Sequence, residues 1–250
     1  METENMTVET MPVAIVTGGG TGIGAACVKI LSQEGFRVGI HYSKSEAQAQ
    51  TVLDEIQGKG FLIQADLAHE DQVESMVQKI KEVAGQVDVL VNNAGMTINE
   101  PILTMKMENF DRQRSLTRGA WYLTKRVLRL FMFRKSKGRI INISSVVGHT
   151  GNAGQIPYTM EKASLDAMTK SLAKELWGRN ILVNSVAPGF IDTKMTHELD
   201  GQIKETIMKT IPLERMGTPE EVAQVVGFLA VKGTYINGTV IHVNGGMYGG

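Results

Sequence analysis

A glycine cluster directly after a short apolar run constrains the fold of this chain more than any other feature. Residues 13–17 read Val-Ala-Ile-Val-Thr, a pattern typical of a strand buried on both faces. Residues 17–24 then read Thr-Gly-Gly-Gly-Thr-Gly-Ile-Gly, and a helical pattern runs from about 22 to 34. The spacing predicts a strand, a tight turn and a helix in that order.

Three glycines in this turn have separate expected tasks. Gly18 permits the sharp turn, Gly22 lets a phosphate approach the backbone, and Gly24 lets the helix pack close to the sheet. The helix N-terminus offers free N–H groups and a positive dipole to a pyrophosphate. No Gly-Lys-Ser/Thr follows, which excludes a P-loop, so the context indicates dinucleotide binding.

The rest of the chain alternates between strand and helix patterns. Six further strands are expected at 36–42, 60–64, 87–91, 139–143, 181–186 and 238–243. Helices are expected at 45–57, 70–84, within 107–134, at 157–178 and at 218–230. Such alternation predicts βαβ units. We therefore expect an α/β fold with one Rossmann-type domain: a doubly wound parallel sheet of seven strands with helices on both faces.

The domain boundaries follow from the same pattern. No Pro/Ser-rich linker divides the chain, so residues 12–250 are expected to form one domain after a disordered tail at 1–11. The least regular stretch, 190–217, follows the sixth strand, where a long loop usually covers a ligand. We expect this stretch to be the substrate loop.

Composition excludes several classes of protein. The chain has 250 residues, with 26 Lys and Arg against 26 Asp and Glu, so it lacks the basic excess of a nucleic-acid binder. The single cysteine, Cys27, forms no intrachain disulfide. No run of 18 apolar residues predicts a membrane span, and the five histidines lack metal-ligand spacing. We expect a cytoplasmic protein with no metal and no membrane partner.

The end of the second strand bears on the choice of dinucleotide. An acidic residue there would bind the ribose of NAD and repel the 2′-phosphate of NADP. This sequence reads His41-Tyr-Ser-Lys-Ser45, in which Ser43 and Ser45 can donate hydrogen bonds and Lys44 supplies positive charge. NADP is therefore favoured. The alternative is that Lys44 is a solvated lysine and that Ser45 caps the next helix.

Tyr158 and Lys162 lie four residues apart, so they share one face of a helix. An ammonium beside a phenol favours the phenolate, which makes Tyr158 usable as an acid and base near neutral pH. Ser145, just past a strand, is placed to hydrogen-bond a carbonyl. A Tyr-xxx-Lys pair alone is common by chance, and here its combination with Ser145 and the glycine loop is informative. No Gly-x-Ser-x-Gly elbow supports Ser/His/Asp catalysis.

At this point the sequence resembles the short-chain dehydrogenase/reductase family over nearly its whole length, from Pro12 onward. The matching segments are Thr17-Gly-Gly-Gly-Thr-Gly-Ile-Gly24, Asp66-Leu67, Asn92-Asn-Ala-Gly95, Ser145, Tyr158-xxx-Lys162 and Pro188-Gly-Phe-Ile-Asp-Thr193. Within the family the chain is most similar to 3-oxoacyl-[acyl-carrier-protein] reductases and acetoacetyl-CoA reductases. That similarity lies in the segments 139–148, 151–155 and 242–246.

The resemblance implies a role for each matching residue. Tyr158 would protonate the ketone oxygen, Lys162 would assist Tyr158 and bind the nicotinamide ribose, and Ser145 would polarise the carbonyl. Gln155 would lie at the substrate mouth. The implied cofactor-binding residues are Gly18, Gly20, Thr21, Gly22, Ile23, Gly24, Ser43, Lys44, Asp66, Leu67, Asn93, Ala94, Gly95, Tyr158, Lys162, Pro188, Gly189, Ile191 and Thr193.

The sequence departs from the family pattern in the long helix before the fifth strand. The family usually has an Asn there that supports a proton-relay water. Different alignments place Thr117 or Leu116 at that position, and the question stays open from the sequence. Three arginines, Arg112, Arg114 and Arg118, are also unusual on this helix, although a solvated face would explain them.

The sequence as a whole predicts an NADPH-dependent reductase of 3-oxoacyl thioesters in fatty acid synthesis, forming a homotetramer like its relatives. An acyl-carrier protein would be an acidic partner, with Lys135, Lys137, Arg139 and Arg179 as docking candidates. One alternative is a short-chain reductase or dehydrogenase acting on a sugar, steroid, quinone or other ketone or alcohol. The other is an NADP-binding protein with weak or no catalysis, suggested by the missing Asn.

Overall fold

The computed structural model describes residues 10–197 and 201–249, and its centre is one parallel sheet. The strands are β1 (Val13–Val16), β2 (Arg37–Tyr42), β3 (Gly60–Gln64), β4 (Val89–Asn92), β5 (Lys137–Ile143), β6 (Asn180–Pro188) and β7 (Val240–Val243). Their order is β3-β2-β1-β4-β5-β6-β7, and each neighbouring pair is parallel. The prediction of a seven-stranded doubly wound sheet is confirmed.

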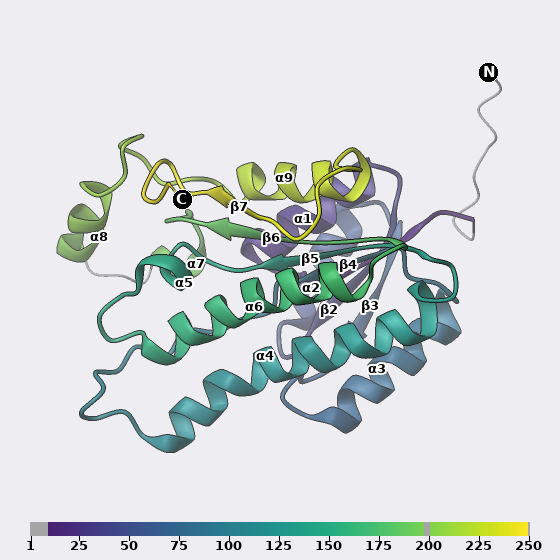
Figure 1. Ribbon diagram of the computed structural model, residues 1–250, viewed down its shortest axis with the longest axis horizontal. Coiled ribbons are helices and arrows are strands. Elements are labelled where there is room, and N and C mark those ends of the chain that lie inside the picture. The colour runs from purple at the N-terminus through teal and green to yellow at the C-terminus, as the bar shows by residue number, and fades with distance from the viewer. Residues whose placement is uncertain (1–9, 198–200, 250) are drawn as a thin grey trace.

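Helices cover both faces of this sheet (Figure 1). One apolar cluster packs α1 (Gly22–Gln33), α2 (Glu46–Glu55) and α9 (Pro219–Val231) on one face. The other cluster packs α3 (Glu70–Val83), α4 (Met107–Val127) and α6 (Ile156–Glu175) on the opposite face. Strands β1 and β4 are buried throughout because they lie between the two clusters, which explains their continuous apolar runs.

The chain reverses its direction of winding between β1 and β4. The first three strands add in one direction from β1, and the next four add in the other, so β1 and β4 are neighbours at the centre. In open α/β sheets ligands bind at such a switch point, outside the carboxyl ends of the strands. Gly18 follows β1 and Asn93 follows β4, and the Asn93 side chain donates hydrogen bonds to the carbonyls of Thr17 and Gly18 at 2.8 and 3.2 Å.

Four short elements were not expected from the sequence. The predicted helix within 107–134 ends as an α-helix at Val127 and continues as a π-helical turn, η1 (Leu128–Met132). Helix α5 (Val147–Thr150) follows Ser145. The irregular stretch 190–217 contains α7 (Lys194–His197) and α8 (Gly201–Met208). Short helices in loops give weak periodic signals, because four to eight residues span only one or two turns.

Several expectations concern the ends and the surface. Of the expected tail, residues 1–9 lie outside the described residues, whereas Met11 is buried and its carbonyl accepts a hydrogen bond from Gln86. Within 10–197 and 201–249, no helix is long and apolar enough to cross a membrane. The same residues contain no group of three or more His, Cys, Asp or Glu that could hold a metal ion.

Candidate functional site

The glycine loop after β1 has the backbone that the sequence predicts. Gly18 and Gly22 have φ of 63° and 52°, in the left-handed region that favours glycine. The N-cap residue of α1, Thr21, makes no side-chain capping bond, so the first turn of α1 depends on another partner for its N–H groups. A Cβ at Gly20 would lie 3.1 Å from the backbone nitrogen of Ala49, so the space between the loop and α2 is too small for a side chain without movement.

Gly24 leaves no room for a side chain at the start of α1. A Cβ at Gly24 would lie 2.0 Å from the carbonyl oxygen of Gly18 and 2.6 Å from the side-chain nitrogen of Asn93. The close approach is therefore between helix α1 and both the turn that follows β1 and the residue that follows β4. This contact holds the N-terminus of α1 against the carboxyl ends of β1 and β4.

Two residues that the sequence analysis missed hold this loop in place. The buried Thr17 hydroxyl accepts hydrogen bonds from the N–H groups of Asn93 and Ala94, both at 2.9 Å. His41 at the end of β2 accepts one from the Gly18 N–H at 3.0 Å, and its other ring nitrogen lies 3.0 Å from the Ala65 carbonyl. A polar residue in an otherwise apolar strand is the sequence signal that would have identified His41.

The other expected cofactor residues follow the ends of successive strands. Ser43 and Lys44 follow β2 and are exposed, while Asp66 and the buried Leu67 follow β3. The Asp66 carboxylate accepts a hydrogen bond from the Ala68 N–H, and its own N–H donates to the Gln72 side chain. These residues therefore form one edge, with the glycine loop between them and β4.

The segment after β6 closes over the glycine loop. Thr193 lies 3.4 Å from the position of a Cβ at Gly22, so little space separates them. Ile191 is buried and pairs with Gly217 in an isolated parallel bridge. Pro188, the last residue of β6, is buried against β7, and a Cβ at Gly189 would clash with Asn244. The structure thus brings the 188–193 segment to the site.

Ser145, Tyr158 and Lys162 come from two adjoining elements. Ser145 follows β5 and is 9% exposed, and its hydroxyl lies 3.4 Å from the Val147 N–H that begins α5. Tyr158 lies in the first turn of α6, where Pro157 stands at a position that tolerates proline. Lys162 follows one turn later, with its ammonium nitrogen 5.6 Å from the centre of the Tyr158 ring.

The Lys162 ammonium is fixed at the centre of the site. It is 7% exposed and donates a hydrogen bond to the Ile143 carbonyl at 2.8 Å. Its nitrogen lies 3.5 Å from the position of a Cβ at Gly95, so a side chain there would compete for this space. A buried ammonium that donates to one protein carbonyl has further donors left for a ligand.

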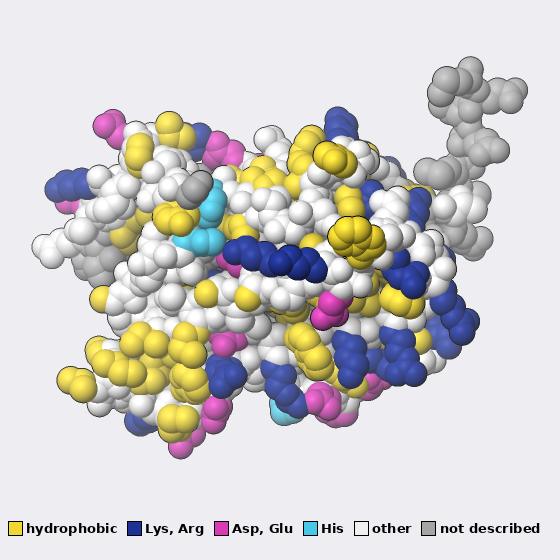
Figure 2. All heavy atoms as spheres, in the orientation of Figure 1, with side chains coloured by type: hydrophobic (Ala, Val, Ile, Leu, Met, Phe, Trp, Pro, Cys, Tyr) yellow, Lys and Arg dark blue, Asp and Glu magenta, His cyan; other side chains and the backbone are white. Residues whose placement is uncertain are grey.

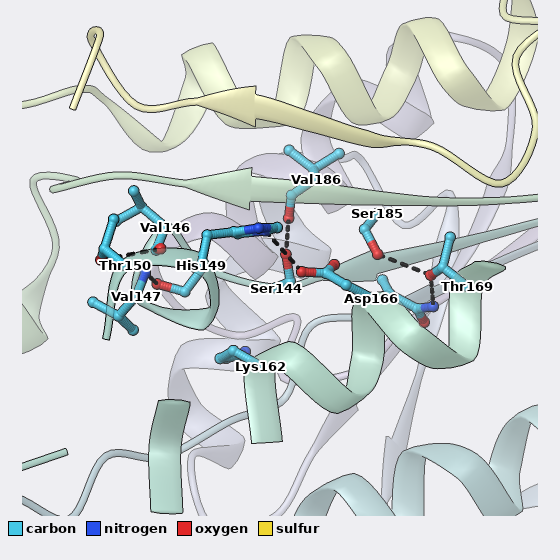
Figure 3. A network of polar contacts seen from close by, with 12 residues as sticks. Ser144, Val146, Val147, His149, Thr150, Lys162, Asp166, Thr169, Ser185 and Val186 are labelled. Carbon is cyan, nitrogen blue, oxygen red and sulfur yellow. Dashed lines mark hydrogen bonds and ion pairs between the residues drawn. The ribbon is translucent and has the colours of Figure 1, made fainter. Parts of the chain in front are cut away.

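A buried polar network supports α6 behind the site. Asn92 donates to Asn142 at 2.8 Å, Asn142 donates to Thr169 at 2.7 Å, and the Thr169 hydroxyl lies 2.8 Å from that of Ser185. Figure 3 shows Lys162, Asp166 and Thr169 pointing from α6 toward the strands. Because the network links β4, β5, β6 and α6, it fixes the helix that carries Tyr158 and Lys162.

A second group of polar rings lies beside this network. The His149 ring stacks on Tyr248 with 5.2 Å between ring centres, and its Nε2 lies 2.9 Å from the buried Asp166 carboxylate. The His242 ring meets His149 edge-on at 4.7 Å. Burial, followed by the nearby His149, lowers the pKa of His242. These contacts join α5, α6 and β7 to the C-terminal segment.

Two further groups were expected to contact the substrate or its carrier. Gln155 donates to Asn99 at 2.7 Å and accepts from Asn152 at 2.9 Å, so both ends of its amide are engaged at the surface. The docking candidates Lys135, Lys137, Arg139 and Arg179 lie next to the amino ends of β5 and β6. Ser145 follows the carboxyl end of β5, so these cations lie at the opposite edge of the sheet from it.

The arginines of α4 differ in their contacts. Arg112 and Arg118 are exposed, and Arg118 forms an ion pair with Glu70 of α3. The Arg114 Nε lies 3.8 Å from the Glu161 carboxylate on α6. The expected solvated face therefore holds for Arg112, whereas the other two link α4 to neighbouring helices.

The residues present fit a dinucleotide. The glycine loop offers an uncapped helix N-terminus and a cradle without Cβ atoms, as a pyrophosphate requires. Lys162 and the segment after β6 stand at the end of this cradle nearest Tyr158. A bound nicotinamide would supply hydride there.

Comparison with known proteins gives a consistent set of relatives. Residues 18–248 match the family model described as enoyl-(acyl carrier protein) reductase. The 3-oxoacyl-[acyl-carrier-protein] reductase FabG of Staphylococcus aureus strain Mu50 is 42% identical over 239 residues, covering 94% of this chain and 97% of that relative. The Aquifex aeolicus protein of the same name is 43% identical over 242 residues, covering 94% and 97%.

A cyanobacterial relative covers still more of the chain. The 3-oxoacyl-[acyl-carrier-protein] reductase of Synechocystis sp. is 42% identical over 248 residues, which is 97% of this chain and 99% of that relative. The similarity therefore spans the sheet, the glycine loop and the segment 190–217 together.

Proposed function

This chain belongs to the short-chain dehydrogenase/reductase family, and from that premise we propose that it reduces 3-oxoacyl thioesters to 3-hydroxyacyl thioesters with NADPH. The observation that carries the proposal is the buried Lys162, which lies beside the Tyr158 ring and Gly95 and donates to the Ile143 carbonyl at the end of β5, two residues before Ser145. Relatives at 42–43% identity that are named 3-oxoacyl-[acyl-carrier-protein] reductases support the substrate class. The reaction is that of fatty acid synthesis.

In the proposed reaction each of the three side chains acts on the ketone oxygen or on its proton donor. Ser145 donates a hydrogen bond to the oxygen and orients the carbonyl. Tyr158 gives its phenolic proton to the same oxygen as the carbon is reduced, and the resulting phenolate is stabilised by the Lys162 ammonium. Since Lys162 also donates to the Ile143 carbonyl, its position is set before substrate binds.

We propose the phosphorylated dinucleotide because of the surface that follows β2. Ser43 and Lys44 are exposed there, and no carboxylate stands between His41 and Ser45 to repel a 2′-phosphate. Asp66 and Leu67 would border the adenine, Asn93, Ala94 and Gly95 the adenosine ribose, and the 188–193 segment the nicotinamide. Gly20, Thr21 and Ile23 would lie along the pyrophosphate with the other residues of the glycine loop.

We propose the stretch 190–217 as the substrate loop of one domain that spans 12–250. It begins after β6 and runs past Thr193, next to the glycine loop, to Gly217. The thioester is carried by an acyl-carrier protein or coenzyme A, and Gln155 would border its entrance. Within one chain the four docking candidates lie at the far edge of the sheet from this entrance, so they do not by themselves deliver substrate to it.

We also propose a homotetramer. Figure 2 shows hydrophobic side chains gathered over the start of α4, the segment before it and the start of α6. The exposed apolar residues in these parts of the chain are Ile102, Leu103, Met107, Ile156 and Met160. An exposed apolar patch of this kind supports association between copies. Sedimentation of the purified chain tests this, and a monomeric mass at working concentration would contradict it.

The function is tested with a panel of purified substrates. Oxidation of NADPH is followed with acetoacetyl-CoA, a 3-oxoacyl-carrier-protein, crotonyl-CoA as an enoyl thioester, and a simple cyclic ketone. We expect turnover of the 3-oxoacyl thioesters with the 3-hydroxyacyl product, at least a hundredfold preference over crotonyl-CoA, and a lower KM for NADPH than for NADH. Preference for crotonyl-CoA, or for the cyclic ketone, would contradict the proposed substrate class.

A further inference from the structure

A carboxylate stands beside the Tyr158–Lys162 pair without a part in the proposed reaction. Glu161 precedes Lys162 in α6 and is 7% exposed, which is rare for an acidic side chain without a full ion pair. It lies three residues after Tyr158, so both side chains lie on the same side of the helix. A buried carboxylate is stable only when hydrogen-bond donors or cations surround it, so the groups that contact Glu161 indicate its role.

The partners of Glu161 come from α4 and from α6 itself. The Thr117 hydroxyl of α4 hydrogen-bonds the carboxylate, and the Arg114 Nε lies 3.8 Å from it. On its own helix the charged and titratable groups near it are Lys162 and Tyr158. Burial raises the pKa of Glu161, while Thr117, Arg114 and Lys162 act in the opposite direction. Burial is the largest of these effects, so the carboxyl holds a proton to higher pH than an exposed glutamate does.

A small cavity connects these groups. Its volume is about 10 Å³, close to that needed for the centre of a single water molecule. Its polar lining is formed by Asn92, Gln113, Thr117, Tyr158, Glu161 and Lys162. Leu116 also lines it, but with an apolar side chain. Thr117 is therefore the residue of the two that contributes a hydroxyl at the position where the family pattern has an Asn.

We propose that Glu161, held by Thr117, is a positioning and proton-supplying residue that reprotonates Tyr158 through Lys162 and one water in this cavity. This rests on the proposed function, since it needs a phenol that loses a proton in each cycle. In each cycle the Glu161 O–H bond breaks as its proton passes to the water. A proton of that water passes toward Lys162, and Lys162 returns one to the Tyr158 phenolate. Glu161 then takes a proton from solvent beside the exposed Arg114. Each step is a proton transfer, so nothing is oxidised or reduced.

A purely structural reading of Glu161 predicts a different result. If the carboxylate only links α6 to α4, its loss should lower the stability of the fold and weaken substrate and cofactor binding. The ionisations seen in the pH profile of kcat should then stay the same. If it supplies protons, its loss should lower kcat while KM values hold, and an ionisation should disappear from the pH profile of kcat.

The test compares Glu161→Gln, Glu161→Asp and Arg114→Gln with the wild type. The full chain is assayed with NADPH and acetoacetyl-CoA from pH 5.5 to 9, and NADPH affinity is measured separately by fluorescence. We expect Glu161→Gln to lower kcat at least tenfold, with KM and NADPH affinity within twofold, and to remove one ionisation from the profile. Glu161→Asp should restore part of kcat, and Arg114→Gln should shift that ionisation upward, because a cation near the carboxylate is lost.

Glu175→Gln is the matched control, since Glu175 is an exposed glutamate on the same helix. It should keep the wild-type kcat and profile. If the wild type is active and Glu161→Gln has the same kcat and pH profile, this inference is overturned while the proposed function stands. A wild type that reduces no 3-oxoacyl thioester would contradict the proposed function, and this inference would fail with it.

Discussion

At the residue scale, His41 determines how the glycine loop is held. It is buried, its Nδ1 accepts from the Gly18 N–H, and the acceptor at the Ala65 carbonyl requires a proton on Nε2. Both contacts are satisfied by neutral imidazole, and protonation would replace the acceptor of the Gly18 bond with a donor. Burial lowers the pKa of His41 to about 4.

This predicts a loss of stability in acid. The unfolded chain binds a proton at position 41 below about pH 6.5, while the folded chain does so only near pH 4. The stabilisation is therefore fully present above pH 6.5 and is lost as the pH falls toward 4, by about 3 kcal/mol at most. The measurement is the free energy of unfolding in urea at several pH values, for the wild type and His41→Gln.

The His41→Gln variant should depend less steeply on pH between 6.5 and 4 than the wild type does. His69→Gln, which removes an exposed imidazole, should follow the wild-type curve. Equal slopes for wild type and His41→Gln would show that the histidine at position 41 does not titrate as described.

At the scale of elements, the first turn of α1 can pack as it does only because Gly24 has no side chain. A Cβ at Gly24 would lie 2.0 Å from the Gly18 carbonyl oxygen, which is a backbone atom, so a side chain there requires the backbone to move. We predict that Gly24→Ala displaces the glycine loop and weakens NADPH binding at least tenfold, as measured by fluorescence titration. Gly249→Ala adds a Cβ with nothing within 4 Å and is the control. Unchanged NADPH affinity in Gly24→Ala would disprove the requirement for this close contact.

Element bounds show what the sequence could and could not predict. The seven strands and six long helices follow from apolar periodicity, because burial on both faces of a parallel sheet leaves a strong signal. The end of α4 could not be predicted, since residues 128–132 keep a helical pattern while their backbone widens to a π-helical turn. Helices α5, α7 and α8 are too short for such a pattern to be read.

At the scale of the whole molecule, the site is assembled from the carboxyl ends of strands that are distant in sequence. Motifs located the glycine loop, Ser145 and the Tyr158–Lys162 pair, because each lies directly after a strand or in a helix with regular spacing. His41, Thr17 and Glu161 were missed because their importance comes from partners that are distant in sequence. Gly18 lies 23 residues from His41, Asn93 lies 76 residues from Thr17, and Thr117 is on another helix from Glu161. Only the fold brings those partners together.

The two edges of the sheet also carry different kinds of residue. The carboxyl edge of the sheet holds every residue proposed for chemistry, while the amino edge holds Lys137 and Arg139. Arg179 there donates to the Phe133 carbonyl and the Ser136 hydroxyl, and its guanidinium lies 3.6 Å from the centre of the Phe133 ring. These contacts give Arg179 a structural role beyond any part in docking.

The central claim is that Tyr158 protonates a 3-oxoacyl thioester as NADPH reduces it. The most direct measurement is the initial rate of NADPH oxidation with acetoacetyl-CoA for the wild type and Tyr158→Phe, with NADPH affinity determined for both. The account predicts a rate at least a hundredfold lower in Tyr158→Phe with NADPH affinity within a few-fold, because only the proton donor is lost. A Tyr158→Phe variant that keeps the wild-type rate would contradict it.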